Sequence, residues 1–257
     1  MSMADNQKLG DRKTGYRIIE GRVQVFCSRY VDIVIDNYYT LWKSFEYIKE
    51  KSYIYDDETM AKKNMLENAM MVVIVFSSMA IESYINDYAA GCLGDNEFYD
   101  SFAKLSVLDK LRLIVQFIYR QEFVKDQPVF TYVKRLIADR NMLVHNKSES
   151  LHKYAARKGI QLPETQEDIQ RIFGSIEKAV YDKPSYFDKE SINGEISRAD
   201  NAIKALHGLV NFIDSNDPSE RAYSRLLGAV FYKNDTDEFK RKKLEVFRKF
   251  QIPTHKL

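Results

Sequence analysis

Residues 128–145 read PVFTYVKRLIADRNMLVH, and their apolar positions decide the fold class of this chain. Proline suits the first turn of a helix, which makes Pro128 a natural start. Apolar side chains then recur at steps of three and four residues, the spacing of one face of an α-helix. They are Val129, Phe130, Val133, Leu136, Ile137, Leu143 and Val144. The stretch therefore predicts a helix packed against a core.

The same helical spacing continues on the N-terminal side of this stretch. It predicts a first long helix over about residues 16–51 and a second that begins near the acidic residues 56–58, whose charge favours a helix start. Gly91 or Gly94 would end the second helix. Ser106 and Asp109 form a capping pattern that opens a third helix, with Phe117 among the residues of its apolar face.

Four such helices joined by short connections predict an all-α fold, an antiparallel bundle. Glycine and proline are scarce, 10 and 5 residues of 257, and alternation typical of strands is never sustained. We expect residues 1–15 to be a polar, disordered lead-in and residues 16–147 to form the bundle. Residues 148–257 would be a C-terminal helical extension, with helices near 167–180, 194–213, 218–232 and 236–251. The pattern leaves open whether this extension packs on the bundle or forms a small lobe.

Composition restricts the function classes. The formal charge of +2 comes from 39 basic and 37 acidic residues, so attraction to nucleic acid would require local clustering of charge. The two cysteines have neither a disulfide pattern nor metal-ligand spacing, so we expect no metal, no cofactor and a reduced cytoplasmic environment. The longest apolar run, residues 69–81, is shorter than the roughly 20 residues that span a bilayer. We therefore expect no membrane segment, and the polar N-terminus predicts no export signal.

Three polar side chains near the end of the fourth predicted helix could act on RNA: Arg140, Asn141 and His145. An imidazole exchanges a proton near neutral pH, and a guanidinium group suits phosphate oxygens. At about 100° per residue, Asn141 and His145 lie roughly 40° apart around the helix, whereas Arg140 lies about 140° from His145. One helix therefore does not complete this site.

An Arg followed directly by a polar residue, with four residues between the Arg and a His, resembles the signature of the HEPN superfamily of all-α proteins. Residues 77–86, SSMAIESYIN, are similar to a segment of the second helix in HEPN bundles. The resemblance covers about half of the chain. HEPN proteins with this motif are typically metal-independent endoribonucleases, often toxins or effectors of phage defence. The resemblance implies an RNA substrate and an antitoxin or other regulatory partner.

The resemblance also implies a role for each motif residue. The ribose 2′-hydroxyl attacks the adjacent phosphate, leaving a 2′,3′-cyclic phosphate, with His145 as acid and base and Arg140 on the phosphoryl oxygens. Asn141 would orient either the His or the phosphate. HEPN domains commonly pair about a two-fold axis, so we expect a homodimer with one composite site. In toxins modified by a nucleotidyltransferase antitoxin, a Tyr commonly stands where this chain has Lys147, so that regulation is not expected.

Two other groups of side chains have two interpretations each. Glu82 lies with Ser78 and Asn86 on a polar line of the second helix, where it would support Arg140 or face water. A basic segment consists of Lys240, Arg241, Lys242 and Lys243. These side chains would either contact an RNA backbone or form a helix face exposed to solvent.

The motif itself has a structural interpretation as well. Arg140 would then pair with a carboxylate, and His145 would only stabilise the end of its helix. The chain would in that case be a non-catalytic module that binds a nucleotide, RNA or protein, or a dimerising helical scaffold.

Overall fold

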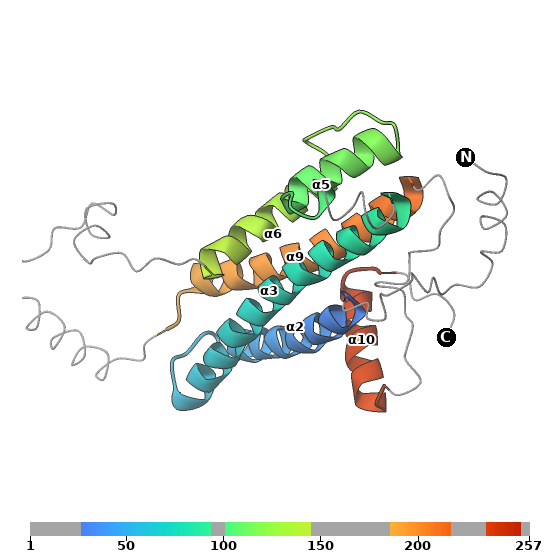
Figure 1. Ribbon diagram of the computed structural model, residues 1–257. Coiled ribbons are helices and arrows are strands. Elements are labelled where there is room, and N and C mark those ends of the chain that lie inside the picture. Colours follow the sequence, from blue (N-terminus) through green and yellow to red (C-terminus); the bar gives the residue numbers. More distant parts are fainter. Residues whose placement is uncertain (1–26, 94–100, 145–185, 217–234, 253–257) are drawn as a thin grey trace, which may run out of the picture.

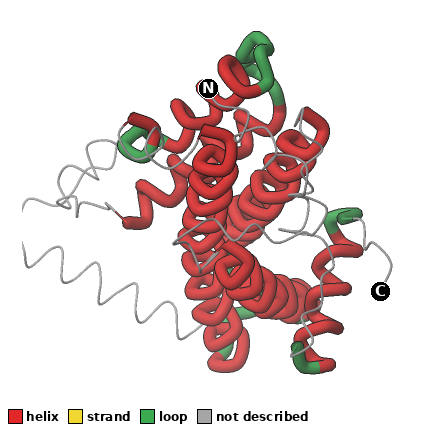
Figure 2. The backbone as a smooth tube through the Cα atoms, turned by 45° about the vertical axis from the view of Figure 1, so that its right-hand side comes forward, coloured by secondary structure: helices red, strands yellow, loops and turns green. Residues whose placement is uncertain are grey.

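The computed structural model describes residues 27–93, 101–144, 186–216 and 235–252, which form helices arranged around one core (Figure 1). The elements are α2 (Cys27–Glu50), α3 (Asp57–Leu93), α5 (Val107–Leu113), the π-helix η2 (Ile114–Ile118), α6 (Pro128–Val144), α9 (Lys189–Asn216) and α10 (Asp237–Lys249). These ranges contain no strand (Figure 2), only an isolated antiparallel bridge between Ile54 and Tyr186. The predicted all-α class is confirmed. The helices expected at 167–180 and 218–232, and residues 16–26 of the first, lie outside the described ranges.

The long helix α3 lies at the centre of the arrangement (Figure 1). It packs along α2 and also contacts α9 and α6, while α6 and α9 lie against each other. Several neighbours explain why α3 is apolar on more than one side. The helix α9, which belongs to the predicted C-terminal extension, thus packs against helices of the predicted bundle.

Side chains that cap the backbone define three of the helix starts. The hydroxyl of Ser106 accepts a hydrogen bond from the Asp109 amide at 3.2 Å, so the predicted capping of the third helix is confirmed. Thr236 caps α10 in the same way, by accepting from the amide of Phe239. Before α3, the amide of Thr59 donates to Asp56 Oδ1 at 2.7 Å, and the amide of Asp56 donates to Thr59 Oγ1 at 2.9 Å. These short-range contacts place the ends of the elements where the sequence suggests them.

The expectation for Phe117 is wrong. Its side chain is 72% exposed, whereas Ile114 and Val115 are buried. The cause is the π-helix that continues α5, in which the amide of Tyr119 donates to the carbonyl of Ile114, five residues earlier. This wider turn changes the angle between successive side chains, so a face calculated for an α-helix no longer applies.

Among the described helices, α3 alone is long and apolar enough to cross a membrane. Residues 57–90 of α3 contain an apolar window whose hydropathy averages 1.5, longer than the run considered from the sequence. In this structure 56% of that window is buried inside the protein, against the neighbouring helices. We interpret α3 as the core helix of the bundle.

The hydroxyl of Tyr38 joins three helices. It donates a hydrogen bond to Asp200 of α9 and accepts one from Lys249 Nζ of α10 at 2.5 Å. Lys249 Nζ also lies 3.7 Å from Asp200 Oδ1. The Tyr38 side chain is fully buried, and this burial, together with the charge of Asp200, raises the pKa of its hydroxyl. The C-terminal helix is therefore tied to α2 and α9 through a buried polar network.

The raised pKa of Tyr38 predicts a loss of stability in alkali. Below about pH 10 the hydroxyl is protonated in both states, so its contribution is complete. Above about pH 10 the unfolded chain releases this proton while the folded chain retains it, so the free energy of unfolding falls as the pH rises. Urea unfolding across this range is expected to give a steeper decline for the wild type than for Tyr38→Phe. Identical slopes would contradict the assignment.

Candidate functional site at the end of α6

Arg140 and Asn141 lie on the last turn of α6, close to the start of α9 (Figure 1). Arg140 is half-buried and Asn141 is exposed. A guanidinium nitrogen of Arg140 donates a hydrogen bond to Asn141 Oδ1 at 3.0 Å. No carboxylate of the described ranges lies within ion-pair distance of Arg140. The structure therefore brings two of the three motif side chains together, while His145 lies outside the described residues.

An ion pair fixes the motif end of α6 to α9. Arg198 Nε lies 3.9 Å from Asp139 Oδ1, and Asp139 directly precedes Arg140. The carboxyl group of Glu195, one turn earlier on α9, has a raised pKa because it is buried. Lys63 offsets this shift, while Glu67, which forms an ion pair with Lys63, adds to it. Charged side chains of α3, α6 and α9 are thus linked through Arg198, the partner of the residue before Arg140.

The carboxylate of Glu82 pairs with a lysine of α5. Its Oε1 lies 3.6 Å from Lys110 Nζ, which also donates to Asn86 Oδ1 at 2.8 Å. Lys110 is 1% exposed, whereas the side chain of Glu82 is 49% exposed. Within the described residues, Glu82 has no contact with Arg140. Two members of the predicted polar line on α3, Glu82 and Asn86, contact Lys110 of α5. A role of Glu82 in supporting Arg140 stays a prediction.

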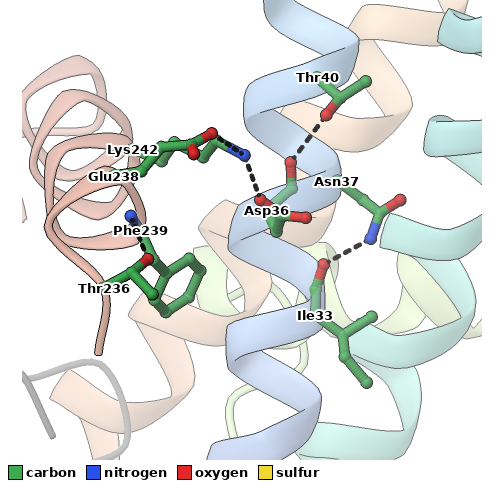
Figure 3. A network of polar contacts seen from close by, with 8 residues as sticks. All are labelled: Ile33, Asp36, Asn37, Thr40, Thr236, Glu238, Phe239 and Lys242. Carbon is green, nitrogen blue, oxygen red and sulfur yellow. Dashed lines mark hydrogen bonds and ion pairs between the residues drawn. The ribbon is translucent and has the colours of Figure 1, made fainter. Parts of the chain in front are cut away.

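The basic segment of α10 is divided between internal and outward side chains. Lys242 Nζ reaches Asp36 of α2 at 2.8 Å and Glu238 at 3.2 Å, as Figure 3 shows. The hydrogen bond to Asp36 raises the pKa of Lys242. Lys243 is buried and lies 3.0 Å from Asp32 and 3.5 Å from Asp235.

Lys240 and Arg241 are the more accessible members of this segment. Lys240 has its ion pair with Asp237 of its own helix, at 3.4 Å, and Arg241 is exposed. Lys242 and Lys243 point toward carboxylates of α2 and are less exposed, so Lys240 and Arg241 stay the candidate contacts for an RNA backbone.

We expect Lys243→Ala to destabilise the protein by about 2 kcal/mol, because it leaves Asp235 poorly solvated and without its cation. Lys240→Ala is the matched control on the same helix, and its partly exposed pair should contribute at most about 0.5 kcal/mol. Urea unfolding of both variants measures the difference. Equal losses in the two variants would mean that the buried pairs do not hold α10 in place.

The described ranges contain no group of three or more His, Cys, Asp or Glu side chains that could hold a metal ion. Cys27 and Cys92 are not joined in a disulfide. Burial and the nearby charge of Asp87 raise the pKa of Cys27 to about 12, so this thiol stays protonated and unreactive near neutral pH.

Sequence reasoning missed the pair of Asp139 and Arg198 and the buried position of Lys110. Asp139 precedes the motif directly, which is a signal that could have been used. The partners of these residues are distant in sequence, so their pairing depends on how α9 and α5 pack. Comparisons with protein-family models, with curated proteins and with solved structures found no match for this chain.

Proposed function

We propose that this chain is a metal-independent endoribonuclease of the HEPN type, with Arg140, Asn141 and His145 as its catalytic motif. One observation carries the proposal. Arg140 has Asn141 as its hydrogen-bond partner and no carboxylate partner among the described residues, whereas Lys110, Lys242 and Lys243 are all paired with carboxylates. A guanidinium group that is not neutralised, on the final turn of a helix, favours an external anion such as a phosphodiester.

The proposed reaction is an attack of the ribose 2′-hydroxyl on the neighbouring phosphate. The neutral imidazole of His145 takes the hydroxyl proton, and an imidazolium protonates the departing 5′-oxygen. Arg140 binds the phosphoryl oxygens, on which negative charge increases in the transition state. The hydrogen bond between the two side chains supports a role for Asn141 in holding the guanidinium. The products are a 2′,3′-cyclic phosphate and a 5′-hydroxyl.

A homodimer supplies what a single α6 lacks. Two residues five positions apart on an α-helix, the spacing of Arg140 and His145, would point roughly 140° apart, and one imidazole transfers one proton at a time. Two copies related by a two-fold axis would place both motifs in one cleft. Met142 and Val144 flank the motif and are 44% and 49% exposed, apolar surface that such an interface would cover.

A toxin or phage-defence effector is the biological role that we propose for this activity. Such an enzyme must be restrained in the cell that makes it, which implies an antitoxin or another regulatory partner. An expression trial tests this role: the wild type is expected to arrest growth of its host and His145→Ala is not. Equal growth with both proteins, at equal soluble levels, would contradict it.

The enzymatic proposal is tested by incubating the purified protein with total RNA in the presence of EDTA. We expect cleavage to fragments with 2′,3′-cyclic phosphate ends, and a loss of about a hundredfold or more in His145→Ala. Circular dichroism and the unfolding midpoint of the variant should match the wild type, so that the loss of cleavage is not a loss of folding. RNA bound without cleavage would instead indicate a binding module, and neither binding nor cleavage a scaffold.

A further inference from the structure

A small cavity of about 180 Å³ opens between α9 and the C-terminal end of α10. It is lined by Ile203, Lys204, His207, Lys249, Phe250 and Gln251. Each polar side chain of this lining can donate hydrogen bonds through nitrogen, and the lining contains no carboxylate. These side chains therefore favour a ligand that accepts hydrogen bonds and carries negative charge.

The ammonium group of Lys249 is the most deeply placed charge of this wall. Its side chain is 26% exposed, and burial lowers its pKa although Asp200 lies 3.7 Å away. Asp200 Oδ1 also accepts the hydrogen bond of Tyr38, so one carboxylate serves two donors. Lys204, on the neighbouring turn of α9, lowers the pKa of Lys249 further. An anion in the cavity would offset the positive charge that these two lysines share.

The imidazole of His207 supplies a further donor. Asn211 Nδ2 donates to His207 Nε2 at 2.9 Å, so Nδ1 carries the proton in the neutral ring. Burial lowers the pKa of His207, which favours this neutral form. Isoleucine and phenylalanine side chains complete the wall, and the Phe250 ring is held edge-on against Tyr38 with the centroids 5.2 Å apart. Lys249 and His207 are thus positioned by contacts within the protein.

The size of the cavity limits the ligand. Pockets for whole drug-sized molecules enclose about 300–1,000 Å³. This cavity of about 180 Å³ is smaller than that and open to solvent, so it suits a phosphate group better than a whole nucleotide. Lys204 has no carboxylate partner among the described residues, and Lys249 shares its Asp200 carboxylate with Tyr38, so a phosphate would supply the negative charge that this pair of lysines lacks. We propose that this cavity binds the phosphomonoester group of a small phosphorylated molecule, whose remaining part stays in solvent.

This site is separate from the catalytic motif. Two residues of α9 contact α6: Arg198 pairs with Asp139, and Asn201 donates to the Tyr132 carbonyl. Asp200 instead contacts Tyr38 of α2 and Lys249 of α10. Lys204 and His207 follow Asp200 by four and seven residues and so share its face of α9. The phosphate site therefore does not depend on whether the chain cleaves RNA.

The site is tested by following the imidazole resonances of His207 by NMR in the full-length protein during titration with inorganic phosphate. His207→Gln assigns the signal. We expect saturable shifts in the wild type and about tenfold weaker binding in Lys204→Ala, which removes an exposed cation without opening the core. Lys134→Ala, at an exposed lysine of α6, is the matched control and should bind as the wild type does.

Two further ligands distinguish binding of a terminal phosphate from binding of a phosphodiester. Adenosine 5′-monophosphate carries a terminal phosphate and should bind at least as tightly as inorganic phosphate. A dinucleoside monophosphate, which has only a bridging phosphodiester with one negative charge, should bind more weakly. The proposal is overturned if His207 does not respond to phosphate, if Lys134→Ala weakens binding as much as Lys204→Ala, or if the diester binds as well as the monoester.

Discussion

A mixture of the Arg140→Ala and His145→Ala variants is expected to cleave RNA, although neither variant cleaves it alone. In a composite site, the two motifs of a dimer jointly supply the guanidinium and the imidazole. Each homodimer of a variant lacks one of these groups completely, so its rate should fall about a hundredfold or more. In an equimolar mixture about half of the dimers are mixed, and each retains one Arg140 and one His145. A single imidazole can take the hydroxyl proton and then donate it to the departing oxygen, so we expect cleavage to return in the mixture at a rate below that of the wild type, whose dimers carry two imidazoles.

The mixing experiment has an internal control. The double variant Arg140→Ala/His145→Ala, mixed with either single variant, leaves every dimer without a guanidinium or without an imidazole, so activity should not return. Light scattering establishes that the proteins are dimers at the concentration of the assay. Dimers that exchange subunits and still show no recovery would exclude a site shared between subunits. Cleavage by a strictly monomeric wild type would exclude it as well.

Lys110→Ala is expected to destabilise the protein by about 3 kcal/mol, the largest loss that we predict for a single side chain. The aliphatic part of Lys110 is packed in the core at 1% exposure, so truncation leaves a cavity. Truncation also removes the donor that Asn86 Oδ1 accepts at 2.8 Å. Thermal unfolding should shift by about 10 °C. Urea unfolding gives the free energy directly.

Lys110→Met separates the two causes of this loss. Methionine retains most of the buried volume but has no ammonium group, so we expect a cost of about 1 kcal/mol. Glu82 is half exposed and remains solvated without its partner, which limits the penalty for an unpaired charge. If Met costs as much as Ala, the polar contact with Asn86 dominates and the packing contribution is wrong.

Local signals made much of the fold predictable. The helix starts at residues 57, 107 and 237 follow capping side chains within three positions of the start. The spacing of apolar residues in α6 predicted that Val129, Phe130, Val133 and Leu136 are buried, and they are, but the same prediction is wrong for Val144, which is 49% exposed. The exposure of Phe117 could not be predicted in this way, because a π-turn alters the helical period that such predictions assume.

Less of the candidate site could be predicted from the sequence, because the residues that contact it come from distant segments of the chain. The spacing of Arg140 and Asn141 on one helix was readable, and their hydrogen bond is observed. That Lys242 and Lys243 would be neutralised by Asp36 and Asp32 depends on how α10 packs on α2, some 200 residues earlier in the chain. The cavity beside Lys249 likewise forms only where α9 meets the end of α10.

The π-turn of η2 has a consequence for how this chain tolerates deletions. A turn closed between residues five apart contains one residue more than an ordinary helical turn. Removing Gln116 would let the segment close as a continuous α-helix, in which the present Phe117 takes the exposed position of Gln116. The deletion of one residue, which disrupts most helices, would here convert an irregular turn into a regular one.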